Sequence, residues 1–351
     1  MTPTTEWIED EGGFLALAGD WERLAEQAAH PFARHDWFRA FWESYPDVVP
    51  AVLVLRAGDE LRGVLPLQRR GRSLHALANE HTPVFTPLAA DEEALEALLD
   101  AAVAASPELV LPLPADHPAT ALLARISKRR GRSFWAEPTV RSPFVETAGT
   151  FEEYRRKVGR NIRKEAERRT RRLHDLGGRA DPLVPPANRQ EELEEGLRLE
   201  ASGWKGERGT AILSDPEAAA FYRRVAELFD AEGRLVFSTA RVGDDLIAFC
   251  FTLLDFDRAW TLKVGIDEGY RHVAPGIVLN YLDIKAAYEQ GLDVYEMLGD
   301  LEPWKQRFMS TTRDHVLVRC FARRPAPVAR TAYRRWVRPP LKRAYGRLRR
   351  R

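Results

Sequence analysis

Short β-rich apolar runs alternate along this chain with longer runs that have helical spacing. Three strands are predicted in succession in the second half, at 235–241, 246–254 and 259–266. Short polar turns of the hairpin type separate them. A helix is predicted at 277–290, where Gly291 ends it, and a last strand follows at 293–298. This order of elements predicts an α/β module with a mixed sheet.

Predicted strands and helices also alternate in the first half of the chain. The runs predict helices at 21–29, after 31–35 as far as 45, at 91–105 and at 118–130, and strands at 51–56, 61–69 and 109–113. In the second of these helices Trp37, Phe38 and Phe41 form an aromatic stripe, which is more typical of a core than of a ligand platform. A proline-rich link near Glu137-Pro138 and Ser142-Pro143 follows. A chain of 351 residues suits two domains, and we expect 1–141 and 142–322.

One long helix is predicted from Thr150 to Gly177, because Thr150 and Glu153 form a capping box at its start and Gly177-Gly178 ends it. Ten Lys or Arg residues lie within 155–172. The apolar stripe is thin, so most of this helix must face solvent, an anion or a partner. A helix at 191–200, a Gly-rich loop at 201–213 that contains Trp204, a helix at 215–230 and a strand at 316–321 complete the half.

The net charge of +1 conceals a strong asymmetry. Residues 323–351 contain 12 Lys or Arg and no acidic residue, which leaves 41 basic and 52 acidic residues in 1–322, a net charge of −11. The basic tail 323–351 carries Tyr333, Trp336 and Leu341 at near-helical spacing, which suits a membrane surface. Because Pro339-Pro340 interrupts this pattern, a disordered tail is the alternative.

Composition excludes several classes of protein. The sequence has no run of about 18 apolar residues and no positively charged start with an apolar core, so we expect a cytoplasmic protein, or one peripheral to the inner membrane face. Cys250 and Cys320 stand in apolar strand-like runs and predict buried thiols rather than a disulfide or a nucleophile. There is no Cys/His cluster with ligand spacing, and no metal is expected.

The candidate chemistry lies in the turn between the strand 259–266 and the helix 277–290. Unpaired backbone amides at such a helix N-terminus can bind a phosphate. Arg271, Ala274, Pro275 and Gly276 resemble the pyrophosphate loop of the GNAT acyltransferases, Arg or Gln, two residues, Gly, one residue, Gly or Ala. Ala274 replaces the usual Gly, and Pro275 offers no N–H. An ordinary turn into a crossover helix is the alternative.

Further residues extend this resemblance over about 20–321. They fall in order as Pro31-Phe32, Trp37, Arg160-Asn161-Ile162-Arg163-Lys164, Trp204, Gly265, Tyr270, Pro275-Gly276, Gly299 and Trp304-Lys305. Together they resemble the CelD/BcsL-type acetyltransferases, a GNAT branch related to the Fem aminoacyl transferases. The resemblance implies two GNAT-like modules side by side, of which the second binds acetyl-CoA or another acyl-CoA. The residues implied to bind it are Val264, Gly265, Ile266, Arg271, His272, Val273, Ala274 and Gly276.

The resemblance also implies direct transfer to an amine or hydroxyl of a small-molecule, cell-envelope or polysaccharide-related acceptor, bound between the modules. Glu296 is the candidate base, with an exposed strand glutamate as the alternative. Asp300 is at the carboxyl end of a strand, where ligands bind, or caps the next turn. Lys305 would stabilise negative charge, or be a surface lysine. The usual GNAT tyrosine motif after the fifth strand is absent.

Two other classes of function remain open at this point. A Fem-like aminoacyl-tRNA-dependent transferase would give the basic segments 155–172 and 323–351 an anionic partner. A non-catalytic module at an anionic membrane surface would use the tail. The retained Arg271 and Gly276 favour acyl-CoA over RNA as the donor.

Overall fold

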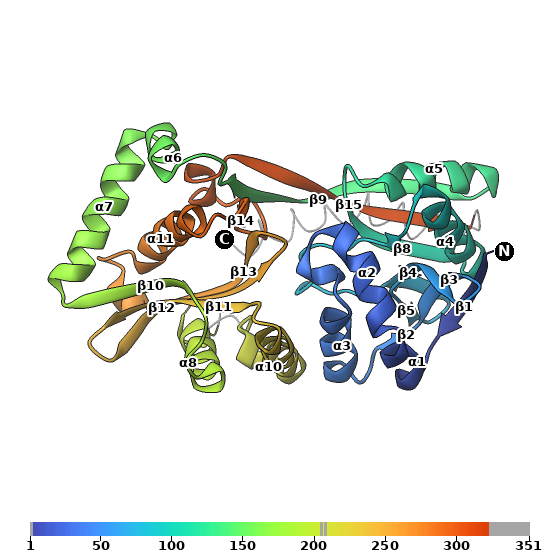
Figure 1. Cartoon of the computed structure of the whole chain (residues 1–351), viewed down its shortest axis with the longest axis horizontal. Helices are drawn as coiled ribbons and strands as arrows, with labels where there is room; N and C mark the ends of the chain where they lie inside the picture. The colour runs from blue at the N-terminus through green and yellow to red at the C-terminus, as the bar shows by residue number, and fades with distance from the viewer. Residues whose placement is uncertain (1–2, 204–205, 207–208, 323–351) are drawn as a thin grey trace, which may run out of the picture.

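The computed structural model describes residues 3–203, 206 and 209–322 (Figure 1). Trp204 and the tail 323–351, both named above, lie outside these residues. The elements of the first half are β1 (Thr4–Ile8), α1 (Glu11–Ala16), α2 (Ala18–Ala28), η1 (Pro31–Ala33), α3 (His35–Ser44), β2 (Val49–Pro50), β3 (Val52–Ala57), β4 (Glu60–Leu65), β5 (Leu67–Arg70), β6 (Ser73–Ala76), β7 (Leu88–Ala89), α4 (Glu92–Ala105), β8 (Glu108–Pro114), α5 (Pro118–Arg129) and β9 (Ser133–Glu146).

The second half contains the strands predicted at 235–241, 246–254 and 259–266 and the helix predicted at 277–290, with small shifts of their ends. Its elements are α6 (Phe151–Lys157), α7 (Arg160–Asp175), β10 (Gly178–Val184), α8 (Arg189–Ser202), η2 (Ile212–Ser214), α10 (Pro216–Ala231), β11 (Leu235–Val242), β12 (Asp245–Asp255), β13 (Arg258–Ile266), η3 (Glu268–Tyr270), α11 (Pro275–Glu289), β14 (Val294–Glu296), η4 (Lys305–Arg307) and β15 (Thr311–Phe321).

The two halves lie side by side and share one mixed sheet (Figure 1). Its strand order is β10-β11-β12-β13-β14-β9-β15-β8-β6-β5-β2, and β1-β3-β4-β7 form a second sheet. The long strand β15 pairs with β8 of the first half and with β9, so β9 and β15 bridge the two halves. The mixed α/β fold predicted from the sequence is confirmed. The expected boundary between 141 and 142 falls inside β9.

The prediction of a loop-like link around Pro138 and Pro143 was wrong, because both prolines lie within β9. Proline lacks an N–H but keeps its carbonyl, and Pro143 O accepts a hydrogen bond of 3.2 Å from Met297 N. The residue before a proline also favours an extended backbone. The register between β9 and β15 shifts beside this segment. A central strand thus accommodates both residues.

Two further predictions need correction. The expected single helix from 150 to 177 is two helices, α6 and α7, because Val158 and Gly159 are extended, with ψ angles of 120° and 142°. The predicted capping box of Thr150 and Glu153 is confirmed. The expected strand 61–69 is divided between the two sheets as β4 and β5, with Pro66 at the division.

A hydrophobic core runs through both halves and joins them. α3 packs against α10, where the Trp37 and Phe221 rings meet edge to face with centroids 5.0 Å apart. Trp37, Phe38 and Phe41 are fully buried, as predicted for the aromatic stripe. Arg34 forms two hydrogen bonds of 2.8 Å to Asp255 across the same contact. The relative position of the two halves is therefore fixed by packing and by a buried ion pair.

Helices cover both faces of the second half of the sheet. α8 packs against β12 and β13, while α11 lies over the opposite face with α7 outside it. Cys250 and Cys320 are buried, as predicted, and are not joined to each other by a disulfide. Within residues 3–322 as far as they are described, no helix has the length and apolar character that crossing a bilayer requires. The same residues contain no cluster of His, Cys, Asp or Glu arranged to hold a metal ion.

Candidate functional site

β13 and β14 run parallel but pair over only three residues each. The last pair joins Trp260 to Glu296. Beyond it β13 continues to Ile266 along β12, while the chain after Glu296 turns toward β9, where Met297 N bonds to Pro143 O. The pairing of β12 with β13 also shifts at Leu262, which is an extra residue on β13. The two strands therefore separate and leave a wedge that begins at Trp260 and Glu296.

A cavity of about 510 Å³ fills this wedge. β13 as far as Ile266 forms one wall, and the first two turns of α11 form another. The turn after β14 and the segment that contains Lys305 close the third side. The cavity thus extends from the buried point where the strands meet to the loop that precedes α11.

That loop has the geometry of a helix N-terminus open to an anion. Ala274 adopts a left-handed conformation, with φ 52° and ψ 60°, and Pro275 is the first helical residue. The amide of Gly276 belongs to the first turn, whose N–H groups have no intrahelical partner. A Cβ atom on Gly276 would lie 3.2 Å from Ile266 Cγ2, so the glycine keeps the cradle open. These residues fit a phosphate group, although Ala274 needs an unfavourable backbone conformation.

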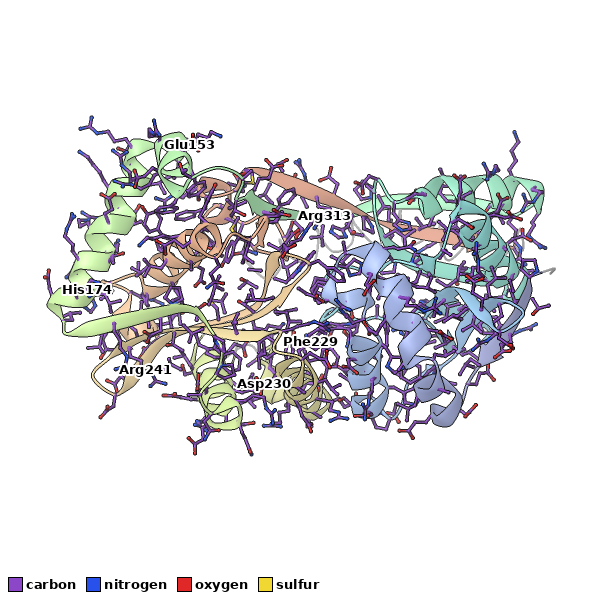
Figure 2. The ribbon with its side chains drawn as sticks, viewed as in Figure 1. Glu153, His174, Phe229, Asp230, Arg241 and Arg313 are labelled. Atoms are coloured by element: carbon purple, nitrogen blue, oxygen red, sulfur yellow. The ribbon has the colours of Figure 1, made fainter. Side chains whose placement is uncertain are left out.

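Basic side chains surround the loop. Arg271 lines the cavity, is 77% exposed and pairs with Glu268. Arg169 on α7 donates a hydrogen bond of 2.6 Å to the carbonyl oxygen of His272. The exposed cations of α7 are Arg160, Lys164, Arg168, Arg171 and Arg172. α6 and α7 form the outer edge of the molecule, where Figure 2 labels Glu153 and His174. The basic helix therefore reaches the loop.

The inner end of the cavity is polar, and the sequence analysis did not find it. Thr261, Asn280 and Tyr295 line it and are at most 6% exposed. Asn280 Nδ2 has no hydrogen-bond partner. Behind these residues lies Asp283, and Tyr295 donates a long hydrogen bond of 3.4 Å to it. Asn280 and Asp283 stand three residues apart among the apolar residues of α11, and that spacing was the signal available in the sequence.

Burial governs the protonation of this inner layer. It raises the pKa of Asp283 from 3.8 to about 7, against hydrogen bonds from Ser238, Tyr295 and Cys250 that lower it. It also raises the pKa of Tyr295 well above 10. Near neutral pH the inner layer therefore contains a neutral phenol and a carboxyl group that is about half protonated.

Lys305 closes the turn after β14. Its Nζ donates hydrogen bonds of 2.8 Å to Leu298 O and 3.3 Å to Asp300 O. Leu298 and Gly299 are both left-handed, with φ angles of 48° and 61°, which directs these carbonyl groups toward the ammonium. Lys305 lines the cavity and is only 8% exposed. Asp300 is exposed and does not line it, and its Oδ1 accepts a hydrogen bond of 2.9 Å from Leu301 N.

Glu296 lies on the opposite face of β14 from Tyr295 and is fully buried. Its Oε1 accepts a hydrogen bond of 2.8 Å from Arg313 and lies 3.5 Å from Arg258, whereas its Oε2 has no hydrogen-bond partner. Arg313, labelled in Figure 2, lies where the two halves meet. This carboxylate therefore faces the first half across a pair of arginines.

The residues that the resemblance assigned to the acyl-CoA do not all face the cavity. Val264, Ile266, Arg271, Ala274 and Gly276 line it. Gly265 faces the other way, because a Cβ atom there would lie 2.9 Å from the backbone nitrogen of Glu200 on α8. Val273 is buried in an apolar cluster. His272 contributes its carbonyl oxygen to the contact with α7.

Residues 160–306 match the family model of the acetyltransferase (GNAT) domain. This part of the chain is a GNAT domain. The wedge, the cavity and the loop at Arg271 to Gly276 all lie within it. Among proteins with curated descriptions, none matches the sequence.

Solved structures extend the similarity of fold to both halves. FemX is 10% identical, with a TM-score of 0.60 over 93% of this chain and 99% of its own. L-PGS from Bacillus licheniformis is 12% identical, with a TM-score of 0.57 over 92% and 95%. A tandem GNAT protein from the clavulanic acid biosynthesis pathway is 12% identical, with a TM-score of 0.51 over 90% and 98%. The predicted arrangement of two GNAT-like modules is thus confirmed, and the fold of the whole chain is similar to that of FemX.

Proposed function

We propose that the protein transfers an acyl group, with acetyl as the simplest case, directly from acyl-CoA to an amine or hydroxyl. The acceptor classes we propose are small molecules, cell-envelope components and polysaccharides. The observation that carries the proposal is the cavity between β13 and β14, with the anion-binding loop of α11 at its outer end. A thioester in this cavity would supply an activated acyl group.

The chain's own residues then take distinct roles in the proposal. Arg271 and the amide of Gly276 bind phosphate at the outer end of the cavity. Lys305 fixes the turn at Leu298 and Gly299, and its charge stabilises negative charge that develops nearby. Glu296 takes a proton from the acceptor through Oε2, the oxygen without a partner. Asp300 shapes the same turn, because its carbonyl accepts from Lys305.

We propose different roles for the two modules, because Tyr295 and Glu296 lie on opposite faces of β14 and only Tyr295 faces the cavity. Residues 142–322 bind the donor, and residues 1–141 shape the acceptor site on the Glu296 side. The CelD/BcsL-like branch remains part of this proposal. So does a cytoplasmic location with a peripheral membrane contact through 323–351.

Donor binding can be tested by isothermal titration of the full chain with acetyl-CoA and desulfo-CoA. We expect saturable micromolar binding that falls at least a hundredfold in Arg271→Glu, because the variant places a second carboxylate beside Glu268 at the loop. Arg179→Glu is the matched control, since Arg179 is exposed on β10 and does not line the cavity. Normal affinity in Arg271→Glu would remove the loop assignment.

An aminoacyl-tRNA-dependent transfer is the second candidate. The exposed cations of α7, next to the loop, favour a large anionic donor. The similarity of fold to FemX and L-PGS is compatible with it. In the same titration, salt-sensitive binding of tRNA that falls in Lys164→Glu and Arg168→Glu, together with no binding of CoA, would replace the first candidate by the second.

A further inference from the structure

The inner end of the cavity contains a buried hydrogen-bond donor that no group of the described residues satisfies. Asn280 Nδ2 is buried and has no hydrogen-bond partner, although the residue is only 5% exposed and lines the cavity. A buried donor without a partner destabilises the protein, because it has lost its hydrogen bonds to water. Such an atom in a ligand cavity indicates an acceptor atom that the ligand supplies.

The neighbouring side chains extend this polar surface. Thr261 lines the cavity opposite α11, and its Oγ1 lies 3.2 Å from Thr252 Oγ1. Tyr295 also lines this end and bonds to Asp283, whose Oδ1 has no partner either. A pocket that receives only alkyl groups is lined by apolar side chains. Here amide, hydroxyl and phenol groups converge at the narrow end.

We infer that this end of the cavity selects a short acyl group that carries an oxygen substituent, a hydroxyl or keto oxygen, which accepts a hydrogen bond from Asn280. The inference rests on the proposed use of acyl-CoA and names the class of acyl group. The position supports it, because Thr261 and Tyr295 adjoin the last residue pair of β13 and β14, where the wedge closes. A donor that enters past the loop at Arg271 reaches this point with its acyl end.

The test is isothermal titration of the full chain with matched pairs of thioesters. Butyryl-CoA is compared with 3-hydroxybutyryl-CoA and acetoacetyl-CoA, propionyl-CoA with lactoyl-CoA, and free CoA is the reference. We expect at least one oxygenated donor to bind about tenfold more tightly than its alkyl partner, which corresponds to about 1.4 kcal/mol. In Asn280→Leu that ratio should fall to about one while free CoA binds as before.

The variants separate this inference from the proposed function. Asn161→Leu on the exposed surface of α7 is the control, and Asn280→Ala replaces Asn280→Leu if the latter does not fold. Equal affinity for alkyl and oxygenated donors in the wild type, or a preference that survives in the Asn280 variants, would overturn the inference and leave acyl-CoA binding intact. An equal loss of affinity for every acyl-CoA in Asn280→Leu would mean that Asn280 binds the thioester carbonyl instead. That result also overturns the inference. Absence of binding of free CoA would overturn the proposed function, and this inference with it.

Discussion

Tyr295 and Glu296 are neighbours on β14, and the two faces of the sheet bury polar groups in different ways. On the cavity face, Asn280, Asp283 and Tyr295 are buried without an ion pair. On the other face, Glu296 is buried in ion pairs with two arginines. Burial of a charge is costly unless it is paired, whereas a neutral group needs only hydrogen bonds.

This difference shows how one short strand can serve two binding surfaces. The cavity face has a carboxyl group whose pKa is near neutrality, so it can hold an uncharged acyl chain without opposing a fixed charge. The Glu296 face keeps Arg258 and Arg313 at the contact between the halves. There burial and the nearby arginines lower the pKa of His30 to about 3. Three predictions test whether the two faces differ in this way.

The largest effect on the free energy of unfolding is expected for Asp283→Asn. The folded protein raises the pKa of Asp283 from 3.8 to about 7, so between these values the folded state binds a proton that the unfolded state has released. The free energy of unfolding must therefore fall as pH rises from 4 to 7. At 1.36 kcal/mol per pKa unit the loss is on the order of 4 kcal/mol above pH 8. The amide of the variant does not ionise, so the variant should avoid this loss.

Urea unfolding of both proteins from pH 4.5 to pH 8.5 measures the effect. The two free energies should be similar near pH 4.5 and should diverge as pH rises, with the variant the more stable. Parallel curves would show that Asp283 is ionised throughout, and the cavity face would then bury a charge just as the Glu296 face does.

Glu296→Gln tests the charged face. Removing the carboxylate leaves Arg258 and Arg313 without a counter-charge, which typically costs 3–5 kcal/mol in a buried pair. Both arginine side chains are partly exposed, at 29% and 20%, so we expect about 2–3 kcal/mol. The measurement is urea unfolding at pH 7, with Glu302→Gln, an exposed glutamate on the cavity side, as the control.

Turnover of the same variant separates a base from a structural ion pair. With a base at Glu296, the folded variant binds acyl-CoA normally and transfers it at least a hundredfold more slowly. Unchanged turnover with reduced stability would leave Glu296 as a structural residue, and the acceptor's proton would then go elsewhere.

Sequence patterns predicted the order of β11, β12, β13, α11 and β14, because hairpin turns and a helix stop are local signals. They also predicted the turn at 271–276 between β13 and α11, while its role as a phosphate-binding loop stays a prediction. They did not predict β9, because its prolines suggest a link. Its pairing partner β15, a strand of 11 residues, lies far away in the sequence. Nonlocal pairing of this kind has no signature in the spacing of residues along the chain.

The sequence also did not show which residues of β13 face the cavity. The resemblance placed Val264, Gly265 and Ile266 together in the donor site, but successive strand residues point to opposite faces. The bulge at Leu262 then sets which of them face the cavity. Asn280 and Asp283 could have been found as polar residues at helical spacing in an apolar helix, but only the structure shows the cavity beside them.

Gly265→Ala tests that assignment of faces and has the smallest expected effect. A Cβ atom at this position would lie 2.9 Å from Glu200 N and 3.1 Å from Glu200 Cα, so β13 and α8 must move apart, at a cost of about 1–3 kcal/mol. CoA affinity should not change, because the new methyl group is on the face away from the cavity.

Gly276→Ala is the matched comparison for Gly265→Ala. Its Cβ meets only the Ile266 side chain, so stability should change little, while CoA affinity falls severalfold as the methyl group enters the cradle. Loss of CoA affinity in Gly265→Ala without loss of stability would place both glycines on the donor side, and the contrast between the two faces of the sheet would fail at β13.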